Sequence, residues 1–362
     1  MENYKTKNII FSFVFLLSIV IPFPMFLLNG GFDADNINLI LAESPKSSVF
    51  NALDEDFKNK YGYRESYLQG HNDLKYYLLN ESTIPKKVVA GKEGWFFIGN
   101  GSSNVVNETL KASVFPMEEK QKILKNFAES KVWLDSMEIS YYTCVAPSKL
   151  SVYPECYYSG ELVGNSKFED LKAFLGQNNW NLIDLKSRIL QKKDSVRLYH
   201  KTDTHWNDEG AYLGYLKLMD ELKIKYPDLT SVNLDEFTRS EKDSVGMDLS
   251  FMLGLKNIES RVIYKKNNSN ITELKRRYKV PAGFSHEEWE YEIRYENKNG
   301  FPLKVMLVRD SFSRAWLKYL KETFAEVVLI WDWKLRKEII EKEKPDILIQ
   351  EIIERDIESF LE

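Results

Sequence analysis

Two short segments, far apart in the chain, hold side chains of the kinds that transfer acyl groups. Asp203 and His205 stand two residues apart, and Ser311 follows an apolar run much later. A histidine can take the proton of a serine hydroxyl, and an aspartate can orient the imidazole and stabilise its charged form. The pattern predicts Ser311 as nucleophile, His205 as base and Asp203 as its orienting partner. Capping or packing roles stay open for these residues, and Ser313 is a competing nucleophile.

Both segments are expected where a loop or turn meets a helix. Asn207 is a good N-cap for a helix over about 208–226, so His205 lies on the loop before it. The apolar run 305–308 is typical of a strand covered on both faces, and a helix over 312–324 follows it. Because ligands bind at the carboxyl ends of parallel strands, Ser311 is expected at a binding edge, beside helix amides.

The rest of the C-terminal region alternates between strand and helix patterns. Strands are expected over 139–145, 181–185, 303–308, 326–330 and 347–352, and helices over 116–137, 168–175, 208–226, 312–324 and 335–343. This alternation predicts an α/β fold, with a doubly wound, mostly parallel sheet and flanking helices. The polar segment 237–300 is expected to be an irregular insertion with a strand pair at 261–265 and 291–297.

Three parts are expected along the chain. Residues 1–30 form a cytoplasmic stub and a transmembrane anchor. Residues 31–110 hold a turn-rich tether over 32–48, lead-in helices over 54–79 and a hairpin between 87–90 and 95–98, in which glycines supply the turn. Residues 111–362 form the catalytic domain.

The N-terminal run Ile9–Leu28 predicts the cellular compartment. It is uncharged and mostly apolar, and about 20 residues of helix span a hydrocarbon layer of roughly 30 Å. Lys5 and Lys7 precede it, so the positive-inside rule puts the N-terminus in the cytoplasm and the chain after Gly31 outside. A cleavable signal peptide is the alternative, but no small-residue cleavage site follows the run directly. We expect a single-pass protein of the cytoplasmic membrane with a periplasmic or extracellular catalytic domain.

Composition narrows the partners. A formal charge of −4, with both signs spread along the chain, gives no basic face for phosphates, so nucleic acid is not an expected partner. The cysteines, Cys144 and Cys156, could form one disulfide or be two buried thiols. These cysteines and four scattered histidines make no zinc-site spacing, so no metal and no cofactor is predicted.

Several short motifs in order resemble one family, the alginate O-acetyltransferases of AlgX and AlgJ type, whose domain is a relative of the SGNH hydrolases. The matching segments are Gly91–Phe97, Ala146–Lys149 with Tyr153–Glu155, Asp203–Trp206, Asp310–Ser313, and Pro345–Ile347 with Glu354–Arg355. The resemblance implies the same triad, an acetyl-serine intermediate, a polysaccharide acceptor, and an acyl donor partner of the multi-pass MBOAT class. A carbohydrate esterase with the same triad, or a non-catalytic polysaccharide-binding scaffold, is the alternative.

Two departures from the wider SGNH pattern bear on the site. Arg309 stands where those enzymes have glycine before Asp-Ser, and no glycine or asparagine block supplies further oxyanion donors. Only the Ser311 amide is proposed for that role. Lys149, Trp206 and Arg309 are predicted to contact substrate. The basic cluster 275–277 is most simply a solvated turn.

Overall fold

A computed structural model describes residues 20, 22–43, 48–60, 64–110, 113–157, 165–256, 258–266 and 270–362. The chain divides into two compact units, residues 1–79 and 80–362. The hairpin predicted near residue 90 therefore belongs to the second unit. Most of the expected anchor, Ile9–Leu28, lies outside the described residues. Among the helices that the structure does describe, none has the length and apolar character to cross a membrane.

The first unit is helical. Its elements are α2 (Pro22–Leu28), α3 (Ala34–Glu43), α4 (Val49–Lys60), α5 (Arg64–Asp73) and a π-helical turn η1 (Leu74–Leu78). The lead-in helices are confirmed, but the turn-rich tether over 32–48 is wrong because α3 occupies most of it. The buried carboxylate of Asp56 accepts hydrogen bonds from Asp33 N (3.1 Å) and Asn36 Nδ2 (2.6 Å), so α4 fixes the start of α3.

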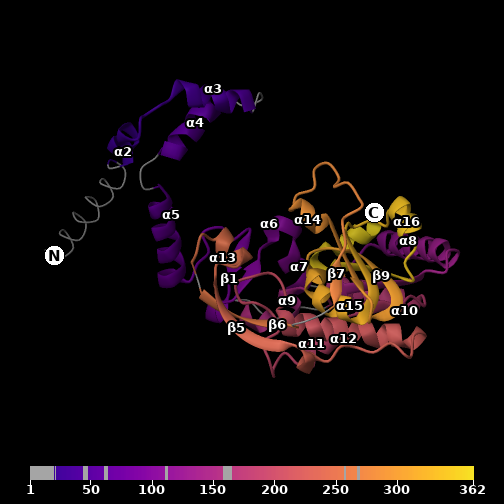
Figure 1. The fold of residues 1–362 in the computed structure, drawn as a ribbon. Helices are drawn as coiled ribbons and strands as arrows, with labels where there is room; N and C mark the ends of the chain where they lie inside the picture. Colours follow the sequence, from indigo (N-terminus) through magenta and orange to yellow (C-terminus); the bar gives the residue numbers. More distant parts are fainter. Residues whose placement is uncertain are drawn as a thin grey trace. The chain divides into compact units, whose positions relative to one another are not determined.

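The second unit is built on a seven-stranded sheet in the order β4-β3-β11-β9-β10-β8-β7. Its strands β7 and β9 are labelled in Figure 1. The strands are β3 (Ser140–Ala146), β4 (Leu182–Asp184), β7 (Ile271–Glu273), β8 (Glu292–Asn297), β9 (Phe301–Arg309), β10 (Phe324–Trp331) and β11 (Ile347–Ile353). Strands β4, β3, β11, β9 and β10 are parallel, whereas β8 is antiparallel to both β10 and β7. The predicted α/β fold with a mostly parallel sheet and flanking helices is confirmed, with an antiparallel edge that makes the sheet mixed.

Apolar side chains leave both faces of the central strands. Along β9, Val305 and Leu307 join one core cluster, while Met306 and Val308 join another on the opposite face. The first face packs against α11 (Lys186–Leu190), α12 (Asp208–Lys225), η5 (Phe312–Trp316) and α15 (Leu317–Thr323). The second packs against α8 (Met117–Asp135), α10 (Lys167–Gln177), α16 (Lys337–Glu343) and η6 (Glu354–Leu361). Burial on both faces explains the continuous apolar runs in these strands.

The 237–300 segment is paired differently from the prediction. Strand β5 (Thr238–Val245) pairs antiparallel with β6 (Ile258–Lys265) as a separate two-stranded sheet, and β8 joins the main sheet instead. The predicted pairing of 261–265 with 291–297 is therefore wrong. Strand β5 was missed because nearly all of its residues are exposed, so it has no alternating apolar pattern to signal a strand.

The remaining elements are short. The predicted hairpin is confirmed, with β1 (Val88–Ala90) antiparallel to β2 (Phe96–Ile98) around η2 (Lys92–Gly94). The other helices are α6 (Asn100–Ser103), α7 (Val105–Leu110), α9 (Lys149–Val152), η3 (Pro154–Cys156), η4 (Leu234–Glu236), α13 (Asp248–Met252) and α14 (Glu288–Tyr291). Both cysteines are free thiols, so the disulfide alternative does not hold.

Candidate active site

The loop of residues 198–207, which leads into α12, carries Asp203 and His205. Asn207 caps the helix as expected, since its Oδ1 accepts a hydrogen bond from Gly210 N at 2.9 Å. The Asn207 amide donates back to the Leu198 carbonyl at 2.9 Å, which closes the loop on itself. A Cβ at Gly210 would lie 2.2 Å from that same carbonyl oxygen, so only glycine allows the helix to pack this closely on the loop.

The side chain of Lys149 fixes this loop through hydrogen bonds to its backbone. Its side chain is 4% exposed, and Nζ donates to the carbonyl oxygens of His200 (3.1 Å), Lys201 (3.0 Å) and Asp203 (2.6 Å). Burial lowers the pKa of Lys149 to about 8, against the opposing effect of nearby carboxylates. The ammonium group has three donors and all three are used, so the predicted contact with substrate is wrong. Lys149 is a positioning residue.

Two carboxylates from the 237–300 segment complete the support of the loop. Glu259 accepts from the Lys201 amide (2.7 Å) and from the amide (2.9 Å) and hydroxyl (2.7 Å) of Thr202. Asp248 accepts from the amide (2.9 Å) and hydroxyl (2.6 Å) of Thr204. Sequence reasoning missed both residues because no local pattern links them to a loop more than forty positions away.

The structure brings Asp203, His205 and Ser311 into one chain of contacts. His205 Nδ1 lies 2.6 Å from Asp203 Oδ1, and His205 Nε2 lies 2.8 Å from Ser311 Oγ. A carboxylate can only accept hydrogen bonds, so the proton of a neutral ring belongs on Nδ1. Nε2 then accepts from the Ser311 hydroxyl. The Asp203 oxygen also accepts from the His205 amide at 2.9 Å, which fixes the carboxylate against the ring.

The electrostatics of the triad suit a general base. Burial lowers the pKa of His205, but the hydrogen bond to Asp203 and the charges of Asp203 and Asp248 outweigh it, so the pKa is raised above its usual value. Burial raises the pKa of Asp203, but the hydrogen bonds to His205 and the charge of that ring lower it by more, so the pKa lies well below its usual range. Asp203 therefore stays charged, and it stabilises the protonated form of His205.

Ser311 lies in the turn that follows β9. Asp310 is 2% exposed and fixes this turn: Oδ1 accepts from Phe312 N at 2.8 Å and Oδ2 accepts from Ile353 N at 2.6 Å. The second bond ties the end of β11 to the turn. Burial raises the pKa of the Asp310 carboxyl. Ser311 has φ −69°, and Arg309 is not among the residues of positive φ, so this turn does not need the glycine of the wider SGNH pattern.

Arg309 is not in position to contact substrate. Its side chain is fully buried, and its guanidinium donates to the carbonyl oxygens of Asp310 and Glu290, both at 2.9 Å. The guanidinium also lies over the Trp331 ring at 4.7 Å. The predicted substrate contact is wrong because the side chain is fully buried and is not among the residues that line the cleft around Ser311. Arg309 supports the turn instead.

Trp206 and Ser313 are buried as well. Trp206 is 2% exposed, and its indole N–H donates to the Phe312 carbonyl at 3.1 Å, linking the histidine loop to the serine turn. The ring of Trp206 packs on Phe312 and Trp316 and is part of the lining of the cleft beside His205 and Ser311, so its predicted stacking on a sugar stays a prediction. Ser313 is fully buried, whereas Ser311 Oγ lies 2.8 Å from His205 Nε2, so Ser311 is the hydroxyl that faces the base.

The triad opens into a cleft of about 740 Å³. Besides the triad, its lining includes the cations Lys87, Arg261, Arg314 and Arg355 and the rings of His286 and Trp331. His286 and Trp331 stack with ring centroids 4.0 Å apart. A cleft of this size with polar and aromatic walls can hold a sugar unit beside Ser311.

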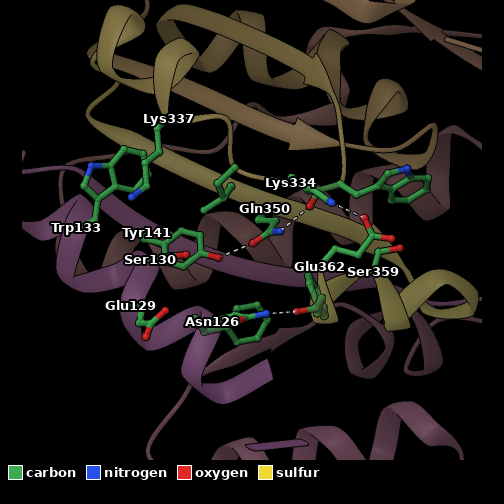
Figure 2. Close-up of a pocket in the computed structure, with 14 residues that line it drawn as sticks. Asn126, Glu129, Ser130, Trp133, Tyr141, Lys334, Lys337, Gln350, Ser359 and Glu362 are labelled. Carbon is green, nitrogen blue, oxygen red and sulfur yellow. Dashed lines mark hydrogen bonds and ion pairs between the residues drawn. The ribbon is translucent and has the colours of Figure 1, made fainter. Parts of the chain in front are cut away.

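A second pocket, of about 320 Å³, shares no residue with this cleft. Figure 2 shows that several of its polar groups bond to one another. Tyr141 Oη donates to Gln350 Oε1 (2.5 Å), Gln350 Nε2 donates to the Trp333 carbonyl (2.9 Å), and Lys334 pairs with Glu362 (3.1 Å). No histidine or cysteine is among its lining residues. The chemistry is therefore assigned to the Ser311 cleft.

Among the described residues, one group of side chains has possible ligand atoms close enough together to hold a metal ion. It comprises Asp203, His205 and Asp248, whose ligand atoms lie within 4.8 Å of one another. These atoms already serve the hydrogen bonds to the imidazole and to Thr204. A cation here would have to displace the Asp203–His205 bond.

Comparison with known proteins identifies the family of this domain. Residues 88–333 match the profile of the SGNH hydrolase-like domain of the acetyltransferase AlgX, which is more than half of the chain. The chain belongs to this family. The predicted resemblance is thereby confirmed, and the domain is an SGNH-like acetyltransferase domain of AlgX type. Curated protein sequences gave no match.

Solved structures share the fold of this AlgX-type domain. PatB1 of Bacillus cereus superposes with a TM-score of 0.54 at 15% identity, over 76% of this chain and 98% of that one. The same protein with a sulfonyl adduct gives 0.54 at 16% identity, over 75% and 96%. A DHHW family protein from Eubacterium siraeum DSM 15702 gives 0.52 at 14% identity, over 74% and 89%.

Proposed function

We propose that this protein is an O-acetyltransferase that moves an acetyl group onto hydroxyls of an exported or cell-surface polysaccharide through an acetyl-Ser311 intermediate. The observation that supports the proposal most directly is the continuous Asp203–His205–Ser311 contact, at 2.6 and 2.8 Å. Membership of a family of acetyltransferase domains supports acetyl as the group that is transferred. The open cleft supports a large acceptor such as a polysaccharide.

In the first half of the reaction, Ser311 takes the acetyl group. His205 Nε2 removes the hydroxyl proton while Oγ attacks the carbonyl carbon of the donor, and the carbonyl electron pair moves to oxygen. Asp203 stabilises the imidazolium that forms. The pair then returns to the carbonyl, the bond to the leaving group breaks, and that group takes the proton from His205.

In the second half, a sugar hydroxyl takes the acetyl group from Ser311. Neutral His205 removes the proton of that hydroxyl, whose oxygen attacks the acetyl carbon. The collapse of the tetrahedral intermediate returns the proton to Ser311 Oγ and restores the resting site. Water in place of the sugar would release acetate, which is the esterase reaction. The imidazole of His205 is about one-third exposed, so water can compete unless the acceptor fills the cleft.

The decisive experiment traps the intermediate. The full chain is mixed with p-nitrophenyl acetate, quenched in acid, digested, and searched by mass spectrometry for acetyl on the Ser311 peptide. We expect acetylation of wild type and none of Ser311→Ala. Ser313→Ala is the matched control, because this buried neighbour should leave acetylation intact. Acetylation that persists in Ser311→Ala would show that another residue is the nucleophile.

A second experiment separates transferase from esterase and scaffold. The acetylated enzyme is offered oligosaccharides, and acetylated sugar and free acetate are both measured. Acetylated sugar supports the transferase, whereas acetate alone supports the esterase. The protein would be a scaffold if it forms no acyl-enzyme and if its Ser311→Ala variant leaves surface acetylation in cells unchanged. A sulfonyl fluoride is a useful second label, because the fold relative PatB1 has been solved with a sulfonyl adduct.

The proposal includes delivery of the acetyl group across a membrane. The apolar run Ile9–Leu28 with Lys5 and Lys7 before it supports an N-terminal anchor and an exported site. An exported enzyme has no access to cytoplasmic acetyl-CoA, so a multi-pass MBOAT-class acyltransferase is the proposed donor partner. Protease added to intact spheroplasts should digest residues after the anchor, and co-purification should recover the membrane partner. Protection of the catalytic domain would refute the orientation.

A further inference from the structure

Arg355 lies beside the nucleophile although it is distant in sequence. Strands β9 and β11 are parallel neighbours, so the turns that follow them share one edge of the sheet. Ser311 follows β9 by two residues and Arg355 follows β11 by two residues. The Ile353–Asp310 hydrogen bond joins these turns, and the Arg355 guanidinium carbon lies 5.5 Å from the centre of the Phe312 ring. Ser311, His205 and Arg355 line the same cleft.

The guanidinium of Arg355 has donors to spare. Its polar contact within the described residues is a long ion pair from Nε to the neighbouring Asp356, at 3.5 Å, and 18% of its side chain is exposed. By contrast, Arg309 donates to two carbonyl oxygens, and Arg314 pairs with Glu290. Both Nη groups of Arg355 therefore remain available to a ligand in the cleft.

An oxyanion that forms beside Ser311 needs hydrogen-bond donors. The Ser311 amide makes no hydrogen bond to the residues that the structure describes, so it can serve as one donor. Acyl-transfer sites place at least two donors around the oxygen that becomes negative, in a position that favours the transition state. The next amide of the turn, Phe312 N, is already bound to Asp310 Oδ1. A guanidinium at the next turn can fill that position.

We propose that Arg355 is the second oxyanion donor, hydrogen-bonding the acetyl carbonyl oxygen as it becomes negative during attack by Ser311. The inference rests on the proposed acetyl-serine reaction. Full negative charge exists only between formation of the Ser311–carbon bond and cleavage of the leaving-group bond. A cation beside this oxygen therefore stabilises the transition states before and after the tetrahedral intermediate more than it stabilises the bound acetyl ester. Arg261 lines the same cleft but lies on β6 and not in a turn adjoining Ser311.

The test measures the rate of acylation directly. The full chain is mixed with p-nitrophenyl acetate in a stopped-flow instrument, and the burst of p-nitrophenolate gives the rate constant for Ser311 acetylation. Arg355→Ala should slow the burst about 100- to 1000-fold, the usual loss for one oxyanion donor. The apparent affinity for the ester should change much less. Arg355→Lys should fall in between because it keeps the charge but not the planar fork.

Chemical rescue separates donation from a structural role. Guanidinium chloride, at concentrations that leave the fold intact, should restore part of the Arg355→Ala rate. Arg188→Ala is the matched control, because that arginine pairs with Asp220 on the helical surface; it should show neither loss nor rescue. If Arg355→Ala does not fold, Arg355→Gln replaces it.

The outcomes distinguish this inference from the proposed function. Loss of the burst with rescue by guanidinium supports Arg355 as the donor. A burst within about tenfold of wild type, or a loss that guanidinium does not relieve, overturns it. In either of those cases wild type still forms acetyl-Ser311, so the proposed function stands. If wild type forms no acetyl-Ser311, the proposed function fails first.

Discussion

Replacing Asp203 by asparagine should disable the base while leaving its position nearly unchanged. Asp203 accepts two hydrogen bonds from His205, one from the ring and one from the backbone. Both bonds end on Oδ1, so an asparagine with its oxygen at that position can keep both, whereas one with its amide nitrogen there loses the backbone bond and presents a donor to Nδ1. The neutral ring would then carry its proton on Nε2, where it cannot accept the proton of Ser311.

The size of the effect follows from this change of tautomer. In serine-protease triads the same substitution lowers kcat by about 10⁴, which corresponds to roughly 5.5 kcal/mol at 1.36 kcal/mol for each factor of ten. Here Asp248 remains 3.9 Å from Nδ1 and can support part of the imidazolium charge. We therefore expect a loss of about 10³ to 10⁴ in the acetylation rate of Asp203→Asn.

The pH dependence of the acetylation rate of Asp203→Asn tests the same reasoning independently. His205 acts as a base only when neutral, so the wild-type rate should rise with pH as the ring loses its proton, at a midpoint above the ordinary value of about 6.5. Asp203→Asn removes the largest influences that raise the pKa of His205 but leaves its burial. The midpoint should therefore move to lower pH.

Stopped-flow acetylation by p-nitrophenyl acetate across pH 5 to 9 measures both quantities, with exposed Asp228→Asn as the matched control. A loss of less than about tenfold would refute the tautomer argument, because it would mean that His205 keeps its orientation without the carboxylate. If the midpoint of the pH profile moves to higher pH in Asp203→Asn, the rise of the rate with pH does not report the titration of His205.

Three other substitutions test Lys149, Trp206 and the buried carboxylate of Glu343, which pairs with Arg294 and Lys304. Lys149→Met should lower kcat with little change in KM, since Lys149 holds three loop carbonyls; a raised KM alone would restore a substrate contact. Trp206→Phe should cost about 1–3 kcal/mol in thermal unfolding by leaving the Phe312 carbonyl unpaired, whereas an effect confined to acceptor KM would contradict this. Glu343→Gln should destabilise the fold by about 3–5 kcal/mol in urea. Burial raises the Glu343 pKa, but its bonds to Arg294, Lys304 and Tyr278 bring it down to about 2, from 4.5. Its contribution is thus present above pH about 4.5 and lost as pH falls towards 2, and a wild-type acid profile in Glu343→Gln would contradict it.

Local patterns predicted the elements that carry the triad. Asn207 signalled the start of α12 because capping is a property of adjacent residues, and the apolar run of β9 signalled a strand buried on both faces. The placement of Ser311 at the end of β9 followed from that strand. The order of short motifs then predicted which residues meet, and the 2.8 Å contact of His205 with Ser311 agrees with that pairing.

Residues whose roles depend on distant partners were predicted poorly. Lys149, Trp206 and Arg309 belong to matching or adjoining motifs, which indicates that they matter but not which way their side chains point. Each proved to hold backbone carbonyls near the site. The strand partner of β6 was predicted wrongly because pairing in a sheet depends on chain topology as well as on the strand's own residues.

The 237–300 segment is better described as part of the support of the candidate active site than as an insertion. It supplies Glu259 and Asp248, which between them hold the backbone of Lys201, Thr202 and Thr204 around Asp203. It also supplies Glu290, whose carbonyl accepts a hydrogen bond from the arginine before the serine turn. These bonds come from separate elements of one segment and converge on both halves of the triad. The orientation of His205 towards Ser311 thus depends on the segment whose own sequence gives the weakest structural signal.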